Sequence, residues 1–144
     1  MDSSYKRYPG GGGRFNGQIL DADGAPTPYA PKWKAYLAAD IVRPISSNLK
    51  AIAHLGWSHQ TRQATDSKII NPTQGFIYAV PGYSLWDARV GIAAEDDAWE
   101  LSLWGRNLSD KRYVVNATAP TVLTFRIERY GEPRMWGATL KGRF

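Results

Sequence analysis

The chain has 144 residues, of which 43% are hydrophobic, and it carries a formal net charge of +5. It contains no cysteine, which excludes a disulfide framework, a thiolate metal site and a cysteine nucleophile. No stretch approaches the roughly 18 consecutive apolar residues of a membrane-spanning helix, so a helical membrane protein is excluded as well.

Residues 1–30 have the composition of a loop. The glycine run at 10–13 and the stretch 21–28, which is rich in aspartate and proline, predict an irregular connection. We interpret residues 3–8 as the remnant of a preceding strand. Residues 1–8 lack the apolar core of a secretion signal, so we expect either a cytoplasmic protein or a true beginning upstream of residue 1.

Apolar and polar side chains alternate in five segments after residue 31, namely 32–41, 49–60, 83–94, 98–106 and 134–144. A period of two is typical of a β-strand with one apolar and one polar face, and about 9–11 tilted residues cross a bilayer. The mean hydropathy of −0.41 agrees with barrel strands, which are apolar only at every second residue. The apolar set of the last segment is Trp136, Ala138, Leu140, Gly142 and Phe144.

The five segments are joined alternately by short and long connections. Residues 43–48 and 95–97 form short polar turns, whereas 61–82 and 107–133 are long and rich in glycine, proline, asparagine and threonine. In an antiparallel meander this places short turns on one rim and long loops on the other, as in outer-membrane barrels. We therefore predict an all-β antiparallel meander with the long loops outside and the short turns on the periplasmic side.

The tryptophans fall near the ends of the predicted strands. Aromatic side chains prefer the two interfaces of a bilayer, so this placement predicts two aromatic girdles. A soluble β-sandwich with a tryptophan-rich core is the alternative, but its tryptophans would lie in mid-strand as often as at the ends. The girdle at the long-loop rim would contain Trp33, Trp57, Trp86 and Trp136, and the girdle at the other rim Trp99 and Phe144.

Several short motifs between residues 30 and 144 follow one another in a recognisable order. They are Ala30-Pro31-Lys32-Trp33, Pro81-Gly82-Tyr83, Asp87 to Ile92, Gly105-Arg106-Asn107-Leu108 with Ser109 to Tyr113, and Tyr130 to Arg134 before the last strand. In this order they resemble the C-terminal end of the TonB-dependent outer-membrane receptors. Gly142 departs from the family pattern, which usually carries a larger apolar residue there, and this could weaken recognition by the barrel-assembly machinery.

The resemblance implies a large barrel of about 22 strands with a plugged lumen in the outer membrane of a Gram-negative bacterium. Such receptors import scarce nutrients, ferric siderophores among them, with energy relayed by TonB from the inner membrane. The implied partners are outer-membrane lipid, the remaining barrel and plug, the TonB system indirectly, and the barrel-assembly machinery through Phe144. Residues 1–30 would be a strand remnant and an extracellular loop, and residues 31–144 the C-terminal barrel strands.

The chain encodes about five complete strands of such a barrel, and it contains neither a plug domain nor a TonB box. A five-stranded open sheet in hydrocarbon would leave two edges of unpaired N–H and C=O groups. We therefore expect a sector of a large transmembrane β-barrel that does not transport by itself, from a truncated gene or a wrongly assigned start.

No combination of side chains indicates catalysis, and we predict neither an enzyme nor a cofactor. His54 and His59 lie five residues apart on one strand, so their side chains point to opposite faces and cannot share a metal ion. The cations of the polar faces would line the lumen, solvate it and contact a plug. Those nearest the loop rim could also attract an anionic metal chelate by focusing the field. These residues are Lys32, Lys34 and Arg106.

Two other classes of protein compete with this interpretation. The pI of about 9.6 and the interleaved aromatics of residues 5–8 suggest a nucleic-acid-binding module. The basic residues scatter over both rims and all strands, so we predict no nucleic-acid partner. A soluble lipocalin-like β-barrel that binds a small ligand is the second alternative, and it would stay monomeric without detergent.

Overall fold

The computed structural model describes residues 4–11, 13–15, 17–21, 23–65, 79–118 and 127–143. The chain divides into two compact units. We call Met1–Lys34, Gln60–Tyr83 and Tyr113–Gly131 the loop unit, and Ala35–His59, Ser84–Arg112 and Glu132–Phe144 the sheet unit. Over the described ranges every helix or strand element is a strand, which confirms the all-β prediction. The same ranges hold no helix long and apolar enough to cross a membrane.

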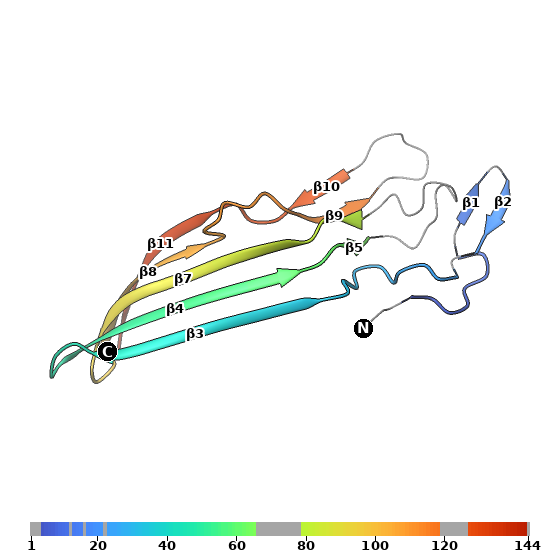
Figure 1. Cartoon of the computed structure of the whole chain (residues 1–144). Coiled ribbons are helices and arrows are strands. Elements are labelled where there is room, and N and C mark those ends of the chain that lie inside the picture. The colour runs from blue at the N-terminus through green and yellow to red at the C-terminus, as the bar shows by residue number, and fades with distance from the viewer. Residues whose placement is uncertain are drawn as a thin grey trace. The chain divides into compact units, whose positions relative to one another are not determined.

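Five long strands form one antiparallel sheet in the order β11-β8-β7-β4-β3, and Figure 1 shows them side by side. This order confirms the predicted meander of five strands. The strands are β3 (Lys34–Pro44), β4 (Leu49–Gln60), β7 (Tyr83–Ala94), β8 (Trp99–Arg106) and β11 (Met135–Gly142).

The bounds of β4 and β7 agree with the predicted segments, whereas β3 is displaced toward the C-terminus. It begins at Lys34 and continues to Pro44, into the predicted turn. The turn is shorter than predicted because the backbone N–H groups of Ile45 and Ser46 both donate to the Leu49 carbonyl, at 2.8 and 3.1 Å. Residues 45–48 are therefore enough to reverse the chain.

The strand register keeps apolar residues beside apolar residues. Leu101 on β8 is the cross-strand partner of Leu140 on β11 and of Ile92 on β7. One residue further along β8, Ser102 is the partner of Thr139 and of Gly91 on the other face. A slip by one residue would exchange the two faces, so this register preserves the predicted division into an apolar and a polar face.

The loop unit contains short strand pairs that the sequence did not predict. They are β1 (Gly13–Phe15) with β2 (Gln18–Leu20), β5 (Gln63–Ala64) with β6 (Ala79–Val80), and β9 (Val114–Thr118) with β10 (Ile127–Tyr130). Strands of two to five residues are too short to establish a period of two, so these stretches were predicted as plain loops. The buried apolar residues of this unit are small and include Ala25, Val80 and Ala117.

The proposed strand remnant at residues 3–8 takes another form in the part that is described. Ser4 makes an isolated bridge with Pro26, and the backbone N–H of Tyr5 donates to the Ala25 carbonyl at 2.9 Å. The Tyr5 and Tyr8 rings contact each other with centroids 4.9 Å apart. These contacts hold the N-terminal segment to the loop at residues 23–26 in place of a regular strand.

Candidate functional site

The apolar face of the sheet unit is exposed, which is unusual for a folded domain. Trp136 is 83% exposed, Leu140 75% and Leu103 60%. Large contiguous apolar surfaces on a folded protein mark a site of contact with a membrane or a partner. The other exposed large residues of this face are Leu37, Ile41, Leu55, Trp86, Val90, Ile92, Trp99 and Leu101.

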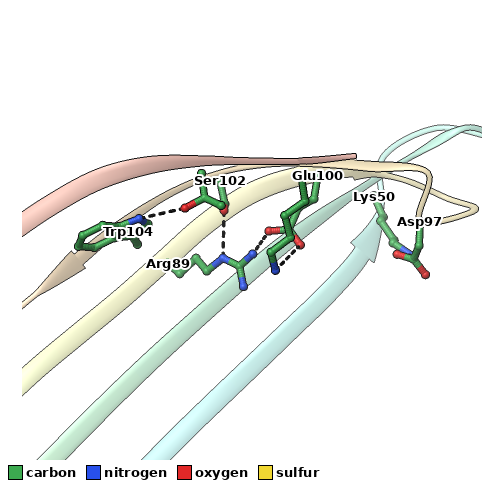
Figure 2. Close-up of polar contacts among 8 residues, drawn as sticks. Lys50, Arg89, Asp97, Glu100, Ser102 and Trp104 are labelled. Carbon is green, nitrogen blue, oxygen red and sulfur yellow. Dashed lines mark hydrogen bonds and ion pairs between the residues drawn. The ribbon is translucent and has the colours of Figure 1, made fainter. Parts of the chain in front are cut away.

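The polar face, in contrast, holds partly buried charges that neutralise one another. Arg89 on β7 donates from Nε to Ser102 Oγ at 3.0 Å, and its guanidinium pairs with the Glu100 carboxylate (Figure 2). Lys141 on β11 lies 3.7 Å from the same carboxylate. Ser102 is only 1% exposed. Three strands therefore meet in one charge network, on the face opposite the exposed apolar side chains.

Trp104 lies on the polar face, where its indole N–H is satisfied. Nε1 donates to Thr139 Oγ1 on β11 at 3.1 Å, and Figure 2 draws this bond as the dashed line from the Trp104 nitrogen. The Arg106 guanidinium carbon lies 5.8 Å from the centroid of the Trp104 ring, within the range of a cation–π contact. Together with His54, Asp87, Ala88, Arg89, Gly105 and Lys141, these residues line an open hollow of about 420 Å³.

The side chains of His54 and His59 have different partners. His54 Nδ1 lies 2.7 Å from Asp40 Oδ1 on the neighbouring strand. The His59 ring stacks on Trp57 with centroids 5.8 Å apart, and its Nδ1 lies 2.9 Å from Ser84 Oγ. Trp57 belongs to the predicted apolar set, so the His59 ring that stacks on it lies on the apolar face. His54 belongs to the polar set, so the two imidazole rings lie on opposite faces of the sheet. Within the described ranges there is no group of three histidine, aspartate or glutamate side chains that could hold a metal ion.

The two short turns are tied together at one end of the sheet. The Glu95 backbone N–H donates to the Asn48 carbonyl at 3.0 Å. Lys50 Nζ lies 2.8 Å from Asp97 Oδ1 and donates to the Glu95 carbonyl at 3.3 Å, and Figure 2 draws Lys50 beside Asp97. These contacts join the β3–β4 turn to the β7–β8 turn and fix the rim that carries them.

The predicted cations are divided between the two units. Lys32 and Lys34 belong to the loop unit, and Arg106 belongs to the sheet unit. Arg106 lies 3.8 Å from the Glu132 carboxylate in a pair whose side chains are both more than half exposed. A pair so open to solvent adds little to the stability of the fold.

Among the residues predicted for the girdles, Trp136 and Trp99 lie at opposite ends of the β8–β11 pair. Trp136 pairs with Gly105 at one end of β8, and Trp99 pairs with Gly142 at the other. The Trp57 and Trp86 rings contact each other, with centroids 6.2 Å apart. Trp33, in the loop unit, is 69% exposed. Phe144 lies outside the described residues.

Asn107 was not among the predicted site residues, although the structure makes it central. It is only 3% exposed although it follows the last residue of β8. One sequence feature could have drawn attention to it: Asn107 stands directly after a strand, within the motif Gly105-Arg106-Asn107-Leu108. The spacing of residues in the sequence does not reveal its hydrogen-bond partners.

Comparison with known proteins gives one partial match. Over 63 residues, which are 44% of this chain, the sequence is 36% identical to the Ferric-pyoverdine M114 receptor PbuA of Pseudomonas sp. (strain M114). The matched stretch covers 7% of the length of that receptor. No protein-family model matches the chain, and no solved structure matches it. Part of the chain is thus similar to a receptor, over a small share of that receptor's length.

Proposed function

We propose that this chain is a sector of the wall of a TonB-dependent outer-membrane receptor, with its apolar face in lipid and its polar face toward the lumen. The observation that carries the proposal is the pairing of an exposed apolar face with a charge-compensated polar face on one antiparallel sheet. A soluble sheet arranges its faces the other way, with the large apolar side chains against a core. The partial match to a ferric-pyoverdine receptor supports the same proposal.

The direction of the edge strands bears on what completes the sheet. β3 and β11 run in the same direction, because four antiparallel steps separate them. Suppose that a second copy lay beside this one with the same face inward and the same rim outward. Then β11 of one copy would run parallel to its neighbour, β3 of the other copy. Outer-membrane barrels have even numbers of antiparallel strands throughout. This favours completion by a different set of strands, odd in number, over closure by copies of this chain.

The activity of the complete receptor would be energised uptake of a scarce nutrient and not catalysis. The name of the similar receptor favours ferric siderophore-type chelates as the ligand class. Lys32, Lys34 and Arg106 would attract such an anionic chelate. The partners would be outer-membrane lipid, the remaining barrel with its plug, TonB indirectly, and the barrel-assembly machinery through Phe144.

Quenching of single-tryptophan variants by lipid tests the proposal. In one variant only Trp136 is kept and in the other only Trp104, with phenylalanine at the remaining tryptophan positions. After reconstitution into phosphatidylcholine vesicles with brominated acyl chains, we expect strong quenching of Trp136 and weak quenching of Trp104. Aqueous iodide should quench Trp104 more than Trp136.

The control is a non-brominated vesicle of the same composition, in which Trp136 should recover its fluorescence. Equal quenching of the two tryptophans by brominated lipid would contradict the assignment of faces. A chain that stays monomeric in buffer and does not bind vesicles would favour a soluble lipocalin-like binder instead.

A further inference from the structure

Asn107 is a buried polar residue at the point where the chain leaves β8. Its backbone has φ of 49° and its exposure is 3%. Asparagine is one of the few residues that adopt this left-handed conformation at low cost. A short polar side chain that is nearly excluded from water must find hydrogen-bond partners in the protein.

The side-chain amide of Asn107 finds three partners on two segments. Its Oδ1 accepts a hydrogen bond from the Lys111 backbone N–H at 2.9 Å. Its Nδ2 donates to the Lys111 carbonyl at 2.9 Å and to the Glu132 carbonyl at 3.0 Å. Both amide hydrogens and the amide oxygen are therefore in use.

The backbone of Asn107 joins the same cluster to the middle of the sheet. Its N–H donates to Asp87 Oδ1 on β7 at 2.9 Å, and the next residue, Leu108, donates to the Trp86 carbonyl at 2.8 Å. Asp110 donates from its backbone N–H to the Asn107 carbonyl at 2.8 Å. Its carboxylate lies 3.4 Å from the Arg134 guanidinium. The turn after β8 is thus bound both to β7 and to the segment that enters β11.

Lys111 and Glu132 stand at the two ends of one long connection. The chain leaves the sheet unit after Arg112 and returns to it at Glu132. A single side chain therefore holds the outgoing and the returning stem side by side. Within the loop unit, the Gly131 N–H donates to the Tyr113 carbonyl at 2.9 Å.

We propose that Asn107 is a positioning residue that latches Lys111, in the segment after β8, to Glu132, in the segment before β11, at the end of the sheet. This inference uses contacts within the sheet unit and does not depend on the proposed function. In a receptor, these contacts of Asn107 would fix the base of a ligand-facing loop, and this role in uptake rests on the proposed function.

The latch explains why this position requires an amide. A carboxylate at residue 107 could still accept from the Lys111 N–H, but it would face two carbonyl oxygens with no hydrogen to donate. Protonation would return one donor. A variant with aspartate at this position should therefore lose the latch at neutral pH and regain part of it in acid.

Hydrogen exchange of the chain in detergent micelles tests the latch. In Asn107→Asp at neutral pH we expect exchange at residues 108–112 and at Gly131 to be at least about tenfold faster than in the unaltered chain, as two lost hydrogen bonds imply. After correction for intrinsic rates, protection should partly return in acid, at a pH above the ordinary carboxyl pKa of about 4, because burial beside two carbonyl oxygens raises the pKa of a carboxyl group. The unaltered chain, measured at both pH values, supplies the reference.

Asn116→Asp is the matched control, because it makes the same chemical change elsewhere. The Oδ1 atom of Asn116 accepts a hydrogen bond from the Tyr29 hydroxyl at 3.2 Å, a role that a carboxylate also fills. We expect less than about a twofold change at residues 108–112 in this variant. If Asn107→Asp fails to fold, Asn107→Ser removes both amide donors without adding charge, and it should give the same local loss at both pH values.

Two outcomes would overturn the latch. One is unchanged exchange at residues 108–112 in both Asn107→Asp and Asn107→Ser. The other is a loss of protection that is equal in the middle of β7 and β8 and does not respond to acid, which would indicate general destabilisation.

Discussion

The indole of Trp104 lies against Gly137, its cross-strand partner on β11. A Cβ atom at residue 137 would lie 2.7 Å from Cζ2 and 3.0 Å from Cε2 of the Trp104 indole. The absence of a side chain on Gly137 thus leaves the space that the large ring of Trp104 needs. Aromatic residues often cover a glycine on the adjacent strand in this way. This space allows the indole N–H to reach Thr139.

We predict that Gly137→Ala displaces the Trp104 ring and lowers the free energy of unfolding by about 1–3 kcal/mol, the usual cost of overpacking. Urea unfolding in detergent micelles measures this change. In a Trp104→Ala background the same substitution should be neutral or stabilising, because alanine is preferred over glycine in a strand by about 0.5–1 kcal/mol. An equal cost in both backgrounds would mean that Trp104 is not the cause.

The charge network predicts a difference between two glutamates. Glu100→Gln removes the carboxylate that Arg89 and Lys141 share and leaves two cations close together, so we expect a loss of about 1–3 kcal/mol. Glu132→Gln removes the exposed partner of Arg106, at 3.8 Å, and should cost less than about 1 kcal/mol. Urea unfolding of the two variants under the same conditions gives the comparison. Similar losses would indicate that the network adds nothing beyond a surface pair.

If the apolar face lies in lipid, the free-energy cost of introducing an arginine should depend on its depth in the bilayer and not on the exposed fraction of the residue that it replaces. Leu103 is 60% exposed in mid-sheet and Ile45 is 59% exposed in the β3–β4 turn. In a bilayer we expect Leu103→Arg to cost about 2–4 kcal/mol and Ile45→Arg about 0–1 kcal/mol. Unfolding from phospholipid vesicles measures both. Equal small costs would argue that the apolar face does not lie in lipid.

The field-focusing hypothesis predicts an effect of salt on uptake. Neutralising Lys32, Lys34 and Arg106 together to glutamine in a complete receptor should slow uptake of an anionic ferric chelate at low ionic strength by about threefold or more. The difference should disappear near 1 M salt, where the Debye length is about 3 Å. The initial rate of radiolabelled iron uptake measures it. A slowing that persists at high salt would point to lost direct contacts instead of attraction at a distance.

Alternation along the sequence determined the long strands and their faces. Because side chains of a strand point alternately to opposite sides, residues 49–60 and 83–94 could be assigned as β4 and β7 with their bounds. The same periodicity put Leu101 and Leu140 on the apolar face and Glu100 and Lys141 on the polar face. The predicted antiparallel meander gave the order of the five strands in the sheet, and the alternation of short and long connections gave the rim of each turn.

Only the tertiary structure decided which side chains meet. A period of two gives a face but not a register, so the sequence did not reveal that Glu100 lies between Arg89 and Lys141, or that Gly137 lies opposite Trp104. Asn107 was hidden for a related reason, since its partners at residues 87, 111 and 132 are brought together by strand pairing and by a turn. Contacts between residues distant in sequence depend on how the strands align, and that alignment is a property of the folded sheet.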